Sequence, residues 1–367
     1  MVRSLFCFAS LFLFLVPLAG QVRLKPEGRL NLTYGLFRVP DADPNLVPLL
    51  TADLGLSAVS PEVRSELQVR FLASEPTQVN LLRAWVRARL GEEARFTAGC
   101  ARVSWGQGIF FNSGDVVYGS NFLNRDLSAT EIRDEASLVL AYYQDFGELS
   151  FFEVVALPPA LVWKAGKLSA GEWDSAAAGG RLVVTLPEDW TGLRWETGYL
   201  FRGEISQPQA LVERGHNLYL ALQGSLWGLA NLYGSARLVL DPRDLSWDKT
   251  KNTLSLSGGV FRIWNMDEGA SFSFRLEGLL ETIIHPPLLS GYLELNFTPD
   301  GKGSFLGRAL FHSDTSANLL LGWVQKMYQG LSAQLLVQAQ LGEPSDVFGF
   351  NRPNDMGVLL VIEYLLR

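Results

Sequence analysis

Hydrophobic and polar residues alternate along most of this chain, which is the pattern of β-strands that have one apolar and one polar face. In the segment 63–71, mostly apolar residues stand at the odd positions from Val63 to Phe71, with charged or amide residues between them. The alternation is clearest in 63–71, 81–90, 193–202, 271–281 and 331–341. These segments are about 9–11 residues long, which is the length that crosses a lipid bilayer when a strand is tilted.

Weaker copies of the same pattern fill much of the remaining chain, and turn-forming residues separate them. They lie at 29–37, 95–103, 136–144, 147–157, 180–186, 216–224, 229–240, 253–264, 288–298, 304–313, 317–326 and 357–366. This makes roughly 17 segments, whereas single-chain bacterial barrels have even numbers of strands. We therefore predict an all-β, antiparallel transmembrane barrel of about 16 strands, with 14 or 18 as alternatives. Longer connections are expected at 39–60, 105–135, 158–179, 203–215 and 241–252.

The composition favours a barrel that faces lipid. Hydrophobic residues make up 48% of the chain and charged residues only 19%, although no internal apolar run reaches the length of a membrane helix. A barrel has this signature because only every second residue must face lipid. A soluble, secreted β-sandwich or barrel is the alternative. Aromatic residues near strand ends favour the membrane, since they could form interfacial girdles: Tyr34, Phe37, Tyr142, Tyr143, Tyr199, Phe201, Trp264, Trp323, Tyr328 and Tyr364.

The first twenty residues predict export. Arg3 precedes an apolar stretch at 5–18, and small residues follow it, as in a secretory signal peptide. An uncleaved helical anchor is the alternative. We predict a signal peptide at 1–20, then a single barrel domain at 21–367 in a bacterial outer membrane. Because Cys7 lies in the signal peptide, Cys100 has no partner for an intramolecular disulfide.

Charge and motifs exclude several classes of function. The formal net charge of −7 argues against nucleic acid as a partner, because binding phosphates needs clustered Lys and Arg. The chain has three histidines, and no pair of them has the spacing of metal ligands. Nucleophile-elbow and phosphate-loop motifs are missing as well. We therefore expect no enzyme activity, no cofactor and no metal.

The polar faces of the predicted strands carry charged side chains that we expect to line the interior. They are Arg64, Glu66, Arg70, Arg83, Arg87, Arg89, Arg194, Glu196, Arg275 and Glu277. A barrel of about 16 strands encloses an aqueous channel by default, although side chains can also fill a barrel completely. The arginines at 64–89 would form a positive stripe on one wall, which favours anionic solutes.

The stretch "RVSWGQGIFFNSGDVVYGSNF" at 102–122 is too rich in glycine for a helix and too long for a hairpin turn. We expect the connection at 105–135 to fold inward and narrow the lumen. Its aromatic side chains would wedge against the inner wall, and its Asn and Asp side chains would face solute. The residues predicted for this constriction are Trp105, Phe110, Phe111, Asn112, Asp115 and Tyr118. A loop that stays on the rim is the alternative.

The segment "GCARVSWGQG" at 99–108 resembles the G-R-Q-x-V-x-W-G segment of bacterial outer-membrane barrels of the alginate-export and porin-like kind. The matching residues are Gly99, Val103, Trp105 and Gly106, whereas Cys100 stands where those barrels have Arg. The resemblance implies passive passage of small solutes through an arginine-lined lumen.

The sequence thus predicts a porin-like channel for small hydrophilic solutes, anionic ones among them, with membrane lipid as its other partner. The alternative is a non-conducting structural or adhesive barrel that binds a partner through its long loops.

Overall fold

The computed structural model describes most of the chain after its first 21 residues. The described residues are 22–38, 45–73, 77–120, 126–128, 135–147, 149–159, 161–164, 167–170, 175–186, 192–203, 215–226, 228–242, 252–266, 269–282, 287–343, 346 and 356–366. The predicted signal peptide at 1–20 lies outside them and stays a prediction. Within the described ranges, no helix is long and apolar enough to span a membrane.

Twenty strands are described, and eighteen of them form one antiparallel sheet. The sheet contains β1 (Arg23–Arg38), β2 (Asn45–Val59), β3 (Val63–Ala73), β4 (Gln78–Arg89), β5 (Ala94–Ala101), β6 (Ser137–Gly147), β7 (Ser150–Leu157), β10 (Ala177–Thr185), β11 (Arg194–Arg202), β12 (Gly215–Leu226), β13 (Ala230–Leu240), β14 (Thr253–Asn265), β15 (Ser271–Glu281), β16 (Leu288–Thr298), β17 (Gly303–His312), β18 (Ala317–Lys326), β19 (Leu331–Leu341) and β20 (Met356–Leu366). The strands β8 (Leu161–Lys164) and β9 (Lys167–Ala170) pair separately.

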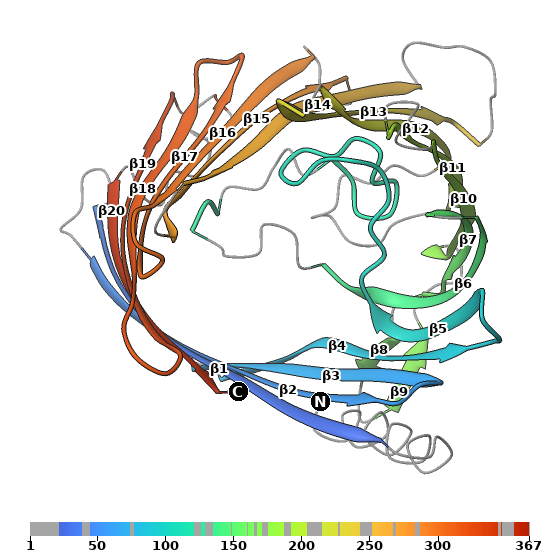
Figure 1. Ribbon diagram of the computed structural model, residues 1–367, viewed down its shortest axis with the longest axis horizontal. Helices are drawn as coiled ribbons and strands as arrows, with labels where there is room; N and C mark the ends of the chain where they lie inside the picture. The colour runs from blue at the N-terminus through green and yellow to red at the C-terminus, as the bar shows by residue number, and fades with distance from the viewer. Residues whose placement is uncertain are drawn as a thin grey trace.

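The sheet closes on itself to form a barrel, as Figure 1 shows. Each strand pairs with its neighbours in the chain, except that β7 pairs with β10 across the β8–β9 hairpin. The first and last strands complete the ring, with Gly28 opposite Leu366 and Arg38 opposite Met356. Closure leaves no free sheet edge, which a membrane-spanning sheet requires because lipid offers no hydrogen-bond partners.

The prediction of an antiparallel barrel is confirmed, but the prediction of about 16 strands is wrong. The barrel has 18 strands, and the strand that the sequence concealed is β2, in the expected connection at 39–60. Its first half, "NLVPLL", is apolar on both faces and contains a proline, so it lacks the alternation that marks the other strands. Pairing with β1 from Asn45 to Val59, and with β3 from Leu50 to Val59, makes it a strand nonetheless.

Alternation places the apolar side chains on the outside. Trp195, Tyr199, Leu276 and Leu335 are all exposed on the outer surface. Two aromatic residues expected in the outer girdles point inward instead: Phe37 packs against a buried cluster, and Tyr143 lies under the guanidinium of Arg95. Each occupies one of the alternate positions of its strand whose side chains point inward. This alternation, and not closeness to the strand end, decides which way the side chain points.

Candidate functional site in the barrel lumen

An irregular segment of residues 102–120, here called the inner segment, leaves β5 and lies inside the ring of strands (Figure 1). Glycines allow it to turn sharply. Gly106 and Gly108 have φ values of 71° and 129°, and a Cβ on Gly106 would lie 2.6 Å from the Cα of Gly114. The chain therefore doubles back on itself with Gly106 and Gly114 in contact, an approach that side chains would prevent.

Two phenylalanines anchor the tip of the inner segment. Phe110 and Phe111 are fully buried and pack edge to face, with their ring centroids 4.9 Å apart. Phe110 also stacks on Tyr292 of β16 at 4.1 Å. The surrounding cluster includes Leu279 and Leu310, which point inward from β15 and β17. Burying one such ring is worth about 1.5–3 kcal/mol, which helps to offset the ordering of a glycine-rich chain.

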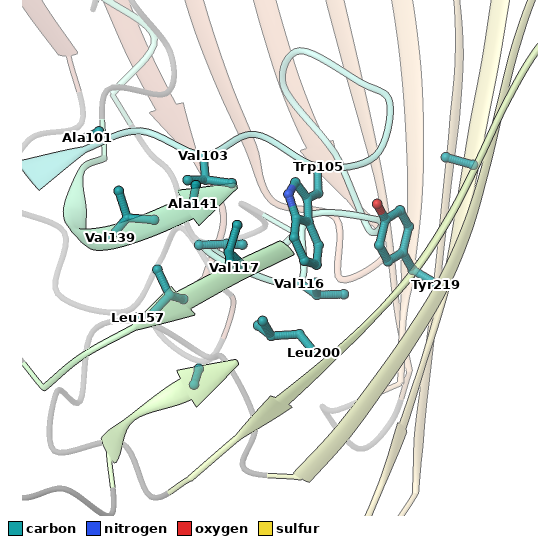
Figure 2. Packing of buried hydrophobic residues seen from close by; sticks show 13 residues of the cluster. Ala101, Val103, Trp105, Val116, Val117, Val139, Ala141, Leu157, Leu200 and Tyr219 are labelled. Carbon is teal, nitrogen blue, oxygen red and sulfur yellow. The ribbon is translucent and has the colours of Figure 1, made fainter. Parts of the chain in front are cut away.

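The start of the inner segment is held by Trp105, whose side chain is fully buried. Its indole N–H donates to the carboxylate of Glu153 at 2.9 Å, and its ring stacks on Tyr219 at 5.9 Å. Figure 2 shows Trp105 facing Tyr219 above Val116, with Leu200 nearby. A second apolar cluster, which also contains Val116 and Val117, therefore fixes the base of the segment against the wall.

Carboxylates of the wall bind the backbone of the inner segment. The N–H groups of Ile109, Phe110 and Phe111 donate to Glu277 at 3.1, 2.9 and 2.6 Å. Successive N–H groups of this kind form an anion-binding concavity, and here the anion is a side chain of the barrel itself. The hydroxyl of Tyr233 donates to the same carboxylate at 2.5 Å.

Two further glutamates act in the same way. Glu196 accepts hydrogen bonds from the N–H of Gly106 at 2.8 Å and from the hydroxyl of Tyr219 at 2.6 Å, and it pairs with Arg181 at 2.9 Å. Glu281 binds a side chain instead, because it accepts a hydrogen bond from the hydroxyl of Ser120 at 2.8 Å. Strands β11–β16, whose inward residues contact the inner segment, are called the covered wall below. The carboxylates of Glu196, Glu277 and Glu281 on this wall are buried beneath the segment rather than open to the lumen.

Asn112 and Asp115 are buried and turned toward the inner segment itself, which differs from the expectation that they face solute. Asp115 accepts from the N–H groups of Val117 and Tyr118 at 3.1 and 3.0 Å, and Asn112 donates to the carbonyl of Trp105 at 2.8 Å. Burial raises the pKa of Tyr118 to about 12, so its phenol is neutral at ordinary pH.

The opposite side of the ring carries arginines. Strands β3–β5 are called the basic wall, and their inward positions hold Arg64, Arg70, Arg83, Arg87, Arg89 and Arg95. Some have carboxylate partners: Arg70 binds Asp53 of β2 through two nitrogens at 2.7 and 2.9 Å, and Arg83 lies 3.5 Å from Glu66. Others lie opposite another arginine on the neighbouring strand: Arg64 is opposite Arg87, and Arg89 is opposite Arg95.

The structure thus divides the residues predicted to line the pore into two groups. Arg64, Glu66, Arg70, Arg83, Arg87 and Arg89 lie together on the basic wall. Arg194, Glu196, Arg275 and Glu277 lie on the covered wall, where Glu196 and Glu277 bind the inner segment. Arg275 is within 3.4 Å of Glu294 and 3.8 Å of Glu277, so its charge is matched locally.

A pocket of about 230 Å³ lies where the basic wall meets the start of the inner segment. The described part of its lining includes the arginines Arg87, Arg95, Arg102 and Arg181 and the carboxylate of Glu153. Tyr143 and Phe151 add aromatic rings. Sequence reasoning missed Arg95, Arg181 and Glu153, because their strands showed weak alternation, and it missed Arg102, which lies in the inner segment after β5. Arg87 faces inward. Following the strand pairing from Arg87 on β4 through β5 and β6 to β7 places Arg95 and Glu153 on the same inner face, so this pairing would have identified them.

Comparisons with known proteins give structural likeness only. No family model matches the chain, and a search of curated proteins found no match. Among solved structures, Wzi of Escherichia coli is similar with a TM-score of 0.59 and 13% identity, over 92% of this chain and 83% of that one. OccD3 of Pseudomonas aeruginosa gives 0.56 and 10%, over 94% and 91%. OccAB4 of Acinetobacter baumannii gives 0.54 and 9%, over 95% and 99%.

These likenesses extend over nearly the whole barrel. Together with the closed 18-strand sheet and its apolar outer face, they show that the chain has the fold of outer-membrane β-barrels with porin-like architecture. The particular family is not shown, and the segment at 99–106 that resembles alginate-export barrels has no matching family model.

Proposed function

We propose that the protein is a channel for passive diffusion of small hydrophilic solutes, with a preference for anions, and that the inner segment sets its narrowest point. The observation that carries the proposal is the separation of charge inside the ring. Buried carboxylates of the covered wall bind the inner segment, whereas arginines of the basic wall remain on the other side. The solute path would therefore run along the basic wall, and charges lining a pore select for the opposite sign.

The alginate-export resemblance and the likeness to outer-membrane barrels support the same proposal at the level of architecture. In this interpretation Glu196 and Glu277 position the constriction and do not touch the solute. Arg64 and Arg87 would contact it. Trp105, Phe110 and Phe111 would act as anchors, because they are buried against the wall.

A second candidate is a barrel that binds carbohydrate without conducting. Wzi is described as an outer-membrane protein involved in group 1 capsule assembly and as a carbohydrate-binding β-barrel. In the present chain, apolar clusters fix the inner segment at its tip and at its base, which suits a filled lumen as well as a narrow one.

Single-channel recording in planar bilayers separates the two candidates. A channel gives discrete conductance steps. In a salt gradient, an anion-preferring channel also gives a reversal potential shifted toward the equilibrium potential of the anion. An excision of residues 107–113 tests the constriction, because Gly106 and Gly114 are already in contact and can be joined. We expect larger steps and a weaker anion preference, since the excision uncovers Glu277. Absence of steps from both proteins would favour the carbohydrate-binding candidate.

A further inference from the structure

The pocket between β4, β5 and the inner segment has more positive charge than its own residues balance. Arg181 is matched, because it pairs with Glu153 at 2.7 Å and with Glu196 at 2.9 Å. Arg87 and Arg95 also line the pocket, and among the described lining residues Glu153 is the one carboxylate. Within this described lining, Arg87 and Arg95 therefore have no carboxylate of their own around a volume of about 230 Å³.

The register of the strands makes this excess costly. Arg64 stands directly opposite Arg87 on β3 and β4, and Arg89 stands opposite Arg95 on β4 and β5. Like charges directly opposite each other across a sheet are destabilising. Two such pairs on adjoining strands are expected only where something else compensates for the repulsion, and a bound anion would do so.

The arginine side chains around the pocket are held in defined positions. The Nε of Arg87 donates to the hydroxyl of Thr97 at 3.0 Å. The guanidinium of Arg95 lies 3.5 Å from the centre of the Tyr143 ring. A guanidinium held by stacking or by one hydrogen bond keeps other N–H groups for a ligand, and its planar fork matches the oxygens of carboxylate or phosphate.

We propose that this pocket is a binding subsite for a small anion that carries two or more carboxylate or phosphate groups. Arg87 and Arg95 bind the oxygens, and Arg102 closes the pocket from the inner segment. The inference deepens the proposed channel function, on which it rests for the route by which the anion arrives. The volume is below the roughly 300–1,000 Å³ of drug-sized ligand sites, so a compact polyanion fits better than a chain of sugars.

Titration calorimetry on the full barrel in detergent tests the subsite directly. Citrate and pyrophosphate are the anionic probes, and uncharged trehalose is the control. We expect binding of at least one anion and none of trehalose. Whichever of citrate and pyrophosphate binds more tightly identifies the anionic group. Arg87→Gln and Arg95→Gln should each weaken the binding about tenfold, because each removes charge-assisted hydrogen bonds.

A matched control is Arg29→Gln. Arg29 is an inward arginine of β1 near Glu363, outside the pocket, and its replacement removes the same charge. Anion affinity should stay within about twofold of the unmodified protein, since screening limits distant charges. If Arg29→Gln weakened anion binding as much as the pocket variants do, the subsite would be overturned, because the overall positive potential of the lumen would then account for the binding. Should either strand variant fail the heat-modifiable migration test of folding, Arg102→Gln, outside the strands, provides the same comparison.

Bilayer recording with the same anions separates this inference from the channel itself. Conductance that citrate or pyrophosphate reduces in the unmodified protein, and much less in Arg95→Gln, supports both. Binding by calorimetry without conductance would overturn the channel and leave the subsite standing. Conductance without binding or block by either anion would overturn the subsite and leave the channel standing.

Discussion

The covered wall and the basic wall contain similar numbers of charged side chains, yet they use them differently. On the covered wall each buried carboxylate has several donors, as Glu277 does with three backbone N–H groups and Tyr233. On the basic wall, arginines stand opposite arginines. Charge on the first wall is structural because it fixes the inner segment, whereas on the second wall Arg64 and Arg89 face other arginines and are the ones that we propose act on solutes.

The largest expected effect is on the covered wall, at Arg237. Its side chain is fully buried, lies 3.6 Å from Glu281 and donates to Ser255 at 3.2 Å. Arg237→Gln removes the buried ion pair between Arg237 and Glu281, and breaking such a pair costs about 3–5 kcal/mol. Urea unfolding of the barrel in lipid vesicles measures the loss.

Arg194→Gln is the control for this prediction. Arg194 belongs to the same wall, but its side chain is 36% exposed and lies 3.7 Å from Glu196. A pair this exposed contributes about 0–1 kcal/mol, so the variant should unfold at nearly the same urea concentration as the parent. A similar loss in both variants would mean that burial does not decide the value of charge on this wall.

The comparison of the two walls assumes that both face inward, which a charge on the outer face can test. Leu335 lies near the middle of β19 and is 52% exposed on the outside. Leu335→Arg should cost about 2–4 kcal/mol, the penalty for arginine on the lipid face near the midplane. Gln334→Arg, one residue away on the inner face, should be mild. Heat-modifiable migration and vesicle unfolding compare them, and equal tolerance would argue for a soluble fold.

A smaller effect is expected at Glu277. Glu277→Gln keeps the shape but removes the charge that three N–H groups of the inner segment share. The loss of charge-assisted hydrogen bonds should lower the free energy of unfolding by about 1–3 kcal/mol and make the single-channel current noisier as the segment loosens. Glu66→Gln on the basic wall, where Arg83 is 3.5 Å away and both side chains are part-exposed, should change neither quantity appreciably.

The sequence predicted the barrel and the inward charges because alternation is a local property. Arg64 and Glu277 were placed on the inner face from their neighbours alone. The strand β2 was not predicted from the sequence, because its first half has no polar face. The division into two walls could not be predicted, since it depends on contacts such as that between Phe110 and Glu277, which are 167 residues apart in the chain. Glycines at 106, 108 and 114 suggested tight turns but not which wall the turns would meet.

The smallest effect has the opposite sign. Arg64 stands across from Arg87, and replacing one member of a like-charged cross-strand pair relieves repulsion. Arg64→Gln should therefore stabilise the barrel by about 0.2–1 kcal/mol in vesicle unfolding, while it weakens the anion preference of the channel. The control is Arg70→Gln on the same strand and face, which loses a two-nitrogen contact with Asp53 and should destabilise. If Arg64→Gln destabilised the barrel as much as Arg70→Gln, the arginines of the basic wall would be structural, and the contrast with the covered wall would fail.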